Sequence, residues 1–172
     1  MITIGCITVS AQTLTTLHSF NGGDGQSPDA ALVQGTDGNF YGTTAFGGTH
    51  FRGTAFKIDA TGNLTTLHSF GAFGFPSEGA IPLAGLVQGS DGNFYGTTAS
   101  GGTHFRGTVF NIDTAGNLTT LHSFSGPPSE GSVPFAGVIQ GTDGNFYGTT
   151  AAGGAHGEGT VFQLTSSSGS TP

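Results

Sequence analysis

The sequence Asp37-Gly-Asn-Phe-Tyr-Gly-Thr-Thr44 recurs without change at Asp91–Thr98 and at Asp143–Thr150. Around this motif, residues 32–70 and 86–124 are identical at 33 of 39 positions, and residues 138–164 match the second copy at 18 of 27. The three copies begin 54 and then 52 residues apart (37 to 91, 91 to 143). A repeat of this length indicates one supersecondary unit that stacks on its neighbours.

Each repeat divides into four short runs rich in aromatic and β-branched residues. In the first repeat these are residues 31–34, 39–45, 54–58 and 64–70, separated by Gly, Asp and Asn. Asp37-Gly38 is a strong hairpin signal, because a tight turn needs the positive φ that Gly adopts at little cost. No stretch shows a sustained 3.6-residue apolar period, so we expect almost no helix and a four-stranded antiparallel meander in each repeat.

Four-stranded units in tandem are typical of propeller blades. Residues 14–20 repeat the fourth run with no earlier run before them, whereas the last repeat stops after its third run at Leu164. We therefore expect an all-β fold of three four-stranded antiparallel repeats with a β-propeller-like architecture, in which the N-terminal strand closes the last blade. Since propellers have about four to eight blades, pairing of two chains, a piece of a longer array and a β-trefoil stay open as alternatives.

The chain is expected to form one repeat domain with a short segment at each end. Val9-Ser10-Ala11 has the small-residue pattern of a secretory cleavage site, which predicts an extracellular or cell-surface protein. The expected divisions are a residual signal-peptide-like segment at 1–11, a domain at 12–164 with its isolated fourth strand at 14–20 and its repeats at 31–70, 85–124 and 137–164, and a Ser-rich tail at 165–172.

Charge and cysteine content exclude several classes of protein. Three Lys and Arg against ten Asp and Glu give a net charge of −7, which excludes a protein that tracks nucleic-acid phosphates. No apolar run reaches the ~20 residues that a membrane-spanning helix needs. Cys6 is the single cysteine, so an intrachain disulfide is excluded.

The repeated residues resemble the bacterial GloVer tandem repeat. The resemblance rests on Asp37–Thr44, Gly47-Gly48, Gly53–Ile58 and Leu64–Phe70, and it recurs at 91–124 and 143–164, so it covers most of the chain. It implies a secreted or surface-displayed bacterial protein, and it supplies no catalytic residues. An enzyme is therefore less expected than a binding module, and no cofactor is predicted.

A glycine-rich loop between the second and third runs is the best candidate for ligand binding. Thr-His-Phe-Arg-Gly stands at 49–53 and again at 103–107, whereas the third copy reads Ala-His-Gly-Glu-Gly at 155–159. A loop that varies on a constant scaffold is where binding specificity usually resides. An aromatic ring and an imidazole beside Arg can stack on a sugar or hold an acidic polymer. The predicted ligand-binding residues are His50, Phe51, Arg52, His104, Phe105, Arg106 and His156.

The alternative for these loops is a solvated turn in which each Arg pairs with Glu78 or Glu130. The six histidines fall into two repeat-equivalent sets, and a ring of three imidazoles could bind a transition metal. Duplication alone also copies a histidine, so no metal site is predicted. Strict alternation in the fourth run places Leu64, Thr66, His68 and Phe70 on one face.

The turn aspartates Asp37, Asp91 and Asp143 are expected to hydrogen-bond their own turns, because calcium loops collect more oxygen ligands. No catalytic residues can be assigned, since Glu78, Glu130 and Glu158 lack a partner at a defined spacing. The sequence thus favours a binding or structural module for carbohydrate or protein. A hydrolase or lyase whose site forms on assembly, and a self-assembling structural protein, are the alternatives. A homodimer or larger homo-oligomer stays open.

Overall fold

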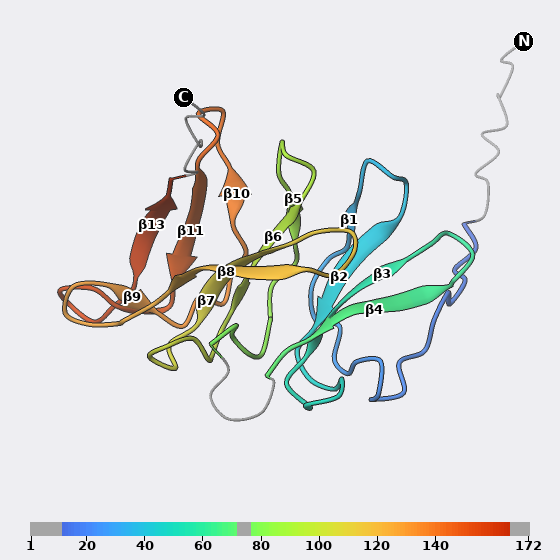
Figure 1. The fold of residues 1–172 in the computed structure, drawn as a ribbon, viewed down its shortest axis with the longest axis horizontal. Coiled ribbons are helices and arrows are strands. Elements are labelled where there is room, and N and C mark those ends of the chain that lie inside the picture. The colour runs from blue at the N-terminus through green and yellow to red at the C-terminus, as the bar shows by residue number, and fades with distance from the viewer. Residues whose placement is uncertain (1–11, 72–76, 166–172) are drawn as a thin grey trace, which may run out of the picture.

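The computed structural model describes residues 12–71 and 77–165, and within these ranges the chain is built from strands and turns without a helix. Two four-stranded antiparallel sheets and one three-stranded sheet follow each other along the chain (Figure 1). Blade 1 contains β1 (Val33–Gln34), β2 (Phe40–Thr44), β3 (Thr54–Ile58) and β4 (Leu64–Ser69). Blade 2 contains β5 (Val87–Gln88), β6 (Phe94–Thr98), β7 (Thr108–Ile112) and β8 (Leu118–Ser123). Blade 3 contains β10 (Ile139–Gln140), β11 (Phe146–Thr150) and β13 (Thr160–Leu164).

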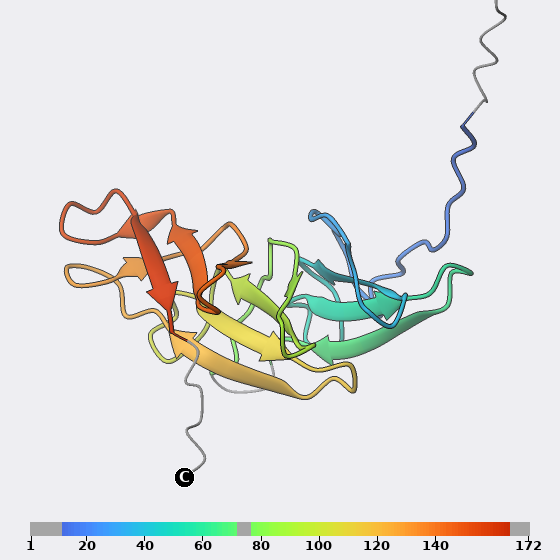
Figure 2. The same ribbon diagram turned by 90° about the horizontal axis from the view of Figure 1, so that it is seen from above.

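The four-stranded meander expected in each repeat is confirmed for blades 1 and 2, and the three described strands of blade 3 pair in the same order. The three sheets stand side by side with their faces packed on one another (Figure 2). This arrangement is that of consecutive propeller blades. A β-trefoil is wrong, because the described strands form separate sheets with an interface between each pair of neighbours, rather than hairpins around one common barrel.

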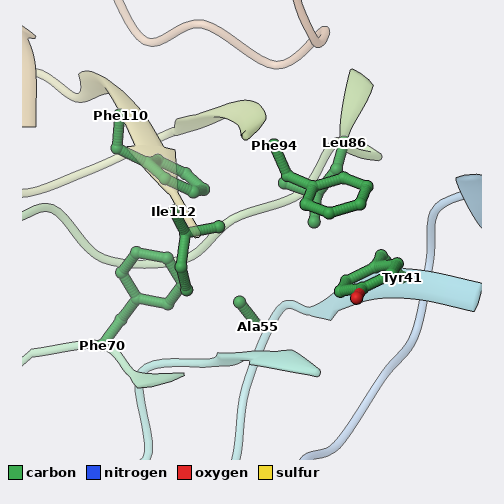
Figure 3. Packing of buried hydrophobic residues seen from close by; sticks show 7 residues of the cluster. All are labelled: Tyr41, Ala55, Phe70, Leu86, Phe94, Phe110 and Ile112. Carbon is green, nitrogen blue, oxygen red and sulfur yellow. The ribbon is translucent and has the colours of Figure 1, made fainter. Parts of the chain in front are cut away.

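Aromatic side chains fill the space between blades. Tyr41 of blade 1 stacks on Phe94 of blade 2, with ring centroids 3.8 Å apart, and Phe70 meets Phe110 edge to face at 5.1 Å. Ala55, Leu86 and Ile112 complete this first core (Figure 3). A second core repeats the arrangement between blades 2 and 3. Burial of both sheet faces explains why the strands carry paired aromatic residues rather than strict apolar and polar alternation.

The segment that enters each blade adds a pairing that the sequence analysis did not foresee. β9 (Gly131–Ser132) pairs with β12 (Ala152–Gly153) in front of blade 3. Single bridges between Gln26 and Phe46 and between Ala80 and Ser100 occupy the equivalent places in the other repeats. The structural repeat therefore begins several residues before the first strand of each blade.

The expected closure of the last blade by the N-terminal strand is wrong within this chain. Residues 12–20 form no strand; they lie beside blade 1, where Phe20 packs edge to face on Phe56 with centroids 5.2 Å apart. Within the described ranges, β13 has a single strand partner, β11. The segment and β13 lie at opposite ends of the molecule (Figure 1). The physical reason is that three blades cover only part of a circle, so the two end blades do not meet.

The fourth strands contain a β-bulge that changes which face their histidines occupy. Ala55 is opposite His68 and Phe56 is opposite Thr66, so Leu67 is the additional residue. The same shift occurs between Val109 and Phe110 in blade 2. The expected alternation of Leu64, Thr66 and His68 on one face is therefore wrong, because an inserted residue moves all later side chains to the other face.

Candidate ligand-binding loops

The predicted binding residues lie in the loops between the second and third strands of successive blades. Each loop is held by its own backbone: Phe51 N–H donates to the Gly48 carbonyl (3.2 Å), and Gly53 N–H donates to the Gly47 carbonyl (3.0 Å). The same two bonds recur in the second and third loops. The three loops lie at the same edge of their sheets, at the bottom and lower left of Figure 1. The repeat thus presents similar turns side by side.

Phe51 and Phe105 have a backbone conformation that aromatic residues rarely adopt. Their φ angles are +58° and +59°, in the left-handed region, where L-residues with a side chain are strained. Their side chains are also exposed, at 78% and 52%. Gly157, with φ +82°, stands at the equivalent position of the third loop, where the same turn forms without this strain. Two loops therefore hold an exposed aromatic ring where the turn itself favours glycine.

The arginine of each of these two loops lies flat against a glycine that follows the fourth strand. A Cβ atom at Gly71 would lie 2.5 Å from Arg52 Cδ, and a Cβ at Gly126 would lie 2.5 Å from Arg106 Cδ. The backbone carbonyls of Arg52 and Arg106 accept hydrogen bonds from Ile81 N–H (2.9 Å) and Val133 N–H (2.8 Å) of the next blade. The loops are therefore fastened to the neighbouring blade as well as to their own.

The alternative that Arg106 pairs with Glu130 is wrong. In the part of the chain that the structure describes, Glu130 binds His122 Nε2 at 2.5 Å and accepts hydrogen bonds from Ser125, and no ion pair joins it to Arg106. Glu78 accepts from Gly71 N–H (3.0 Å) and lies 3.4 Å from His68 Nε2. Glu130 therefore contacts His122 and Ser125 at the end of the fourth strand rather than the loop arginine.

The third loop differs in chemistry from the first two. His156 and Glu158 are both exposed there, whereas His50 of the first loop is half-buried and His104 is exposed. The structure keeps the seven predicted residues in three separate loops, one per blade. The described residues contain no group of three or more His, Cys, Asp or Glu side chains that could hold a metal ion.

Contacts between a histidine and a carboxylate recur three times, and the sequence analysis missed them. His18 Nε2 lies 2.8 Å from Asp24, His68 lies 3.4 Å from Glu78, and His122 lies 2.5 Å from Glu130. The statement that these glutamates lack a partner at a defined spacing is therefore wrong. The available signal was a constant distance: Asp24 to Thr44, Glu78 to Thr98 and Glu130 to Thr150 each span 20 residues, and a glycine follows each acid.

These pairs fasten the fourth strand of one blade to the entry of the next. The bulge in β4 and β8 turns the histidine toward the acid, and the ring also meets a Phe two residues later, at 5.0 Å for His68 and Phe70. Burial lowers the pKa of His68, and the neighbouring Glu78 offsets only part of that effect. Burial acts to raise the pKa of Glu130, but hydrogen bonds from Ser125 and His122 bring it below its ordinary value. The arrangement is a structural clasp between the end of one blade and the start of the next.

The turn aspartates bind their own turns, which confirms the structural interpretation. Asp37 accepts hydrogen bonds from Asn39 N–H (3.1 Å), Asn39 Nδ2 (2.8 Å) and the Tyr41 hydroxyl (2.7 Å). The bonds from Asn39 and Tyr41 hold the pKa of Asp37 below its usual value. Burial, followed by the bond to Asp37, raises the pKa of Tyr41 to about 12. The tyrosine therefore stays protonated and fixes the turn to the sheet.

A groove of about 470 Å³ opens between blades 2 and 3 beside the second of these turns. Its polar side chains bind one another: the Tyr95 hydroxyl donates to Asp91 (2.8 Å), and Gln140 Nε2 donates to Ser90 Oγ (3.2 Å). Its apolar wall includes Phe146, which stacks on Tyr95 at 3.9 Å. The residues that line the groove are Ser90, Asp91, Tyr95, Asn111, Leu121, Gln140, Gly144, Phe146, Leu164 and Thr165.

Comparisons with known proteins were made for both the structure and the sequence. Two solved structures resemble the fold: virginiamycin B lyase from Staphylococcus aureus, at 16% identity and a TM-score of 0.48, and a streptogramin B lyase, at 15% and 0.49. The alignments cover 79% and 80% of this chain but 41% of each lyase, so the chain spans less than half the length of either.

No curated protein matches the sequence. A search of the described residues finds no helix long and apolar enough to cross a membrane. The Gloeobacter/Verrucomicrobia repeat family matches residues 3–171, and the chain belongs to this family.

Proposed function

We propose that this chain is a carbohydrate-binding module, and that the loops around Phe51 and Phe105 bind an acidic polysaccharide. The observation that carries the proposal is the exposure of both rings at positive φ, at 78% and 52%. Residues in strained backbone conformations persist only where the surroundings hold them, and they gather at ligand sites. Gly157 makes the same turn in the third loop, so the turn itself does not require an aromatic residue.

The chemistry of the loops favours an acidic sugar. An exposed aromatic ring offers an apolar face to the C–H groups of a pyranose. Arg52 and Arg106 follow the two rings directly, and a guanidinium binds a carboxylate through two parallel hydrogen bonds. The overall charge of −7 opposes nonspecific attraction of a polyanion, so binding depends on these two local cations.

Titration calorimetry with polygalacturonate tests this proposal. We expect binding to the wild-type chain, and a loss of affinity on the order of tenfold for Phe51→Ala and again for Phe105→Ala, which corresponds to about 1.4 kcal/mol each. Phe135→Ala is the matched control, because it removes an exposed phenylalanine ring (56% exposed) that lies outside the three loops, and its affinity is expected to stay near wild type. A neutral glucan of similar length separates the roles of ring and arginine.

Equal binding by wild type and the Phe51→Ala/Phe105→Ala double variant would overturn the proposal. If the neutral glucan binds as well as polygalacturonate, the role of the aromatic rings is supported and the preference for an acidic sugar is refuted. Binding of a protein ligand, with no binding of either polysaccharide, would refute the proposal that the ligand is a carbohydrate.

Secretion is the second part of the proposal. Val9-Ser10-Ala11 supports it with a small-residue pattern that is typical of a cleavage site, and these residues lie outside the described ranges. Mass spectrometry of the chain recovered from culture medium is expected to show Gln12 as the first residue. A chain that stays inside the cell and keeps residues 1–11 would refute secretion.

A further inference from the structure

The interface between blades 1 and 2 is repeated between blades 2 and 3 with the same contacts. Tyr41 stacks on Phe94 at 3.8 Å, and Tyr95 stacks on Phe146 at 3.9 Å. The Phe that follows each fourth strand meets the third strand of the next blade edge to face at 5.1 Å, as Phe124 does with Phe162. Each blade thus has a tyrosine face, which binds the following blade, and a phenylalanine face, which binds the preceding one.

Hydrogen bonds across the two interfaces also repeat. Thr43 Oγ1 donates to the Ala84 carbonyl and Thr97 Oγ1 donates to the Ala136 carbonyl, both at 2.9 Å. Gln88 accepts from Thr36 N–H at 3.0 Å, as Gln140 does from Ser90 N–H at 2.9 Å. Each interface therefore has a fixed set of donors and acceptors as well as an aromatic core.

The tyrosine face of blade 3 carries the same residues but lies open. Val161 is 80% exposed, whereas its equivalents Ala55 and Val109 are fully buried. Ile139 is 67% exposed, and Thr149, whose equivalents donate to the next blade, is exposed as well. Among the described strands, β13 pairs only with β11, and no strand lies at the edge where blades 1 and 2 have their fourth strand. Such an edge pairs readily with another strand.

The phenylalanine face of blade 1 is open in the same way. Leu32 is 51% exposed, whereas its equivalents Leu86 and Val138 are 8% and 5% exposed. Beside this face, residues 14–20 already hold the place that β4 holds beside blade 2: a Cβ at Gly62 would lie 2.5 Å from the Leu17 carbonyl, as a Cβ at Gly116 would from the Leu67 carbonyl. The segment thus stands as the fourth strand of a preceding blade whose other strands are not in the described chain.

We propose that a second copy of this chain docks head to tail, with the open tyrosine face of each copy on the open phenylalanine face of the other. Tyr147 then stacks on Phe40 of the second copy, and Thr149 donates to the Ala30 carbonyl. Residues 14–20 of the second copy pair with β13 as its missing fourth strand. Equivalence with β3 and β4 fixes the register: Gln163 is opposite Thr15, as Lys57 is opposite Thr65.

A second copy is the occupant that the observations favour, because the two open faces carry the residues equivalent to those that meet at the two internal interfaces, among them Tyr147 and Phe40. The contact is heterologous, and heterologous contacts close into a ring when the rotation between copies permits it. Two copies with three blades each give six, within the usual range of about four to eight. Both open faces and both open edges are then covered in both chains.

Light scattering after size-exclusion chromatography of the full chain tests the assembly. We expect twice the 17.2 kDa mass of one chain across a concentration series. Val161→Arg places a charge in the new interface but in solvent on a single chain, so we expect a single-chain mass with an unchanged circular dichroism spectrum. Phe51→Arg is the matched control, because it adds the same charge at an exposed apolar position outside both open faces, and we expect it to remain a dimer.

Cross-linking between chains tests the register and does not depend on the folding of the Val161 variant. In a Cys6→Ser background, a chain with Thr15→Cys is mixed with one carrying Gln163→Cys, and oxidation is expected to give a two-chain product. Ser19→Cys is the control partner, since four residues along a strand displace it by about 13 Å.

A single-chain mass at every concentration, or a mass that rises beyond two chains, would overturn the closed pair. Equal cross-linking from positions 15 and 19 would overturn the strand register.

Discussion

Replacement of Phe51 by glycine is expected to stabilise the protein while it removes the proposed binding platform. The turn holds residue 51 at φ +58°, and a left-handed conformation costs an L-residue with a side chain about 1–2 kcal/mol. Glycine removes this cost but adds about 0.5–1 kcal/mol through the greater freedom of the unfolded chain. Since the side chain is 78% exposed, its removal sacrifices little burial. The net expectation is a gain of about 0–1.5 kcal/mol in the free energy of unfolding, centred on ~0.75 kcal/mol.

Phe51→Ala is the control that separates strain from side-chain loss. Alanine removes the ring but keeps the left-handed strain, so its unfolding free energy is expected to equal that of the wild type or to lie slightly below it. Thermal unfolding followed by circular dichroism compares both variants, and the glycine variant is expected to melt about 1–3 °C above the alanine variant. The same comparison at Phe105 provides an independent repeat in the second loop, at φ +59°.

The reasoning is refuted if the glycine variant is no more stable than the alanine variant in either loop. In that case the turn would hold no strain at this position, and the argument that the aromatic ring is kept for binding would lose its basis. If the glycine variant is more stable and still binds polysaccharide normally, the backbone strain in the wild type is supported, but a role of the aromatic ring in binding is refuted.

Three further perturbations follow from the repeated contacts, each measured by urea unfolding. Gly79→Ala is expected to cost about 3 kcal/mol, because its Cβ would overlap the paired threonine hydroxyls of blade 2, whereas Gly92→Ala, with open space around it, is expected to cost only the backbone strain of about 1 kcal/mol. Equal costs would show that the close approach is relieved by small shifts. Tyr95→Phe removes the 2.8 Å bond to Asp91 and is expected to cost about 1 kcal/mol, with a smaller effect for Tyr147→Phe on the open face; the reverse order would contradict the assignment of burial. Burial acts to raise the pKa of Asp91, but hydrogen bonds from Tyr95 and the turn bring this pKa below its unfolded value of 3.8. The contribution of Asp91 to the free energy of unfolding is therefore fully present above the unfolded pKa, and it is lost as the pH falls through the lower pKa of the folded state. Asp91→Asn is therefore expected to weaken the fall in stability below about pH 4, and an unchanged acid profile would exclude this carboxylate as its source.

The stability cost of Tyr147→Phe also depends on whether the proposed dimer forms. If two copies close into a ring, Tyr147 is buried against Phe40 of the second copy, and Tyr147→Phe then costs nearly as much as Tyr95→Phe at concentrations where the dimer forms. Repeating the titration below and above the dissociation range distinguishes the two conditions. If Tyr147→Phe costs the same free energy at every protein concentration, the Tyr147 hydroxyl does not lie in the interface between the two copies.

Features of this fold that depend on local chemistry could be predicted from the order of the residues. Three nearly identical copies predicted three similar units, and Asp-Gly-Asn between two runs of β-forming residues predicted each hairpin, because a tight turn requires positive φ at glycine. The aspartate of that turn binds the turn backbone, as expected for a short polar side chain next to glycine. The absence of a helical period predicted sheets, and the described residues contain no helix.

Features that depend on contacts between blades could not be predicted from the order of the residues. The bulge in the fourth strand turns His68 toward Glu78, and no local pattern marks where a strand will take up an additional residue. The left-handed conformation of Phe51 contradicts the preference of its own residue type, so a turn fixed by neighbouring glycines had to impose it. Closure by residues 14–20 was predicted from the order of the runs, but the angle between packed blades determines where that segment lies, and a sequence carries no direct record of that angle.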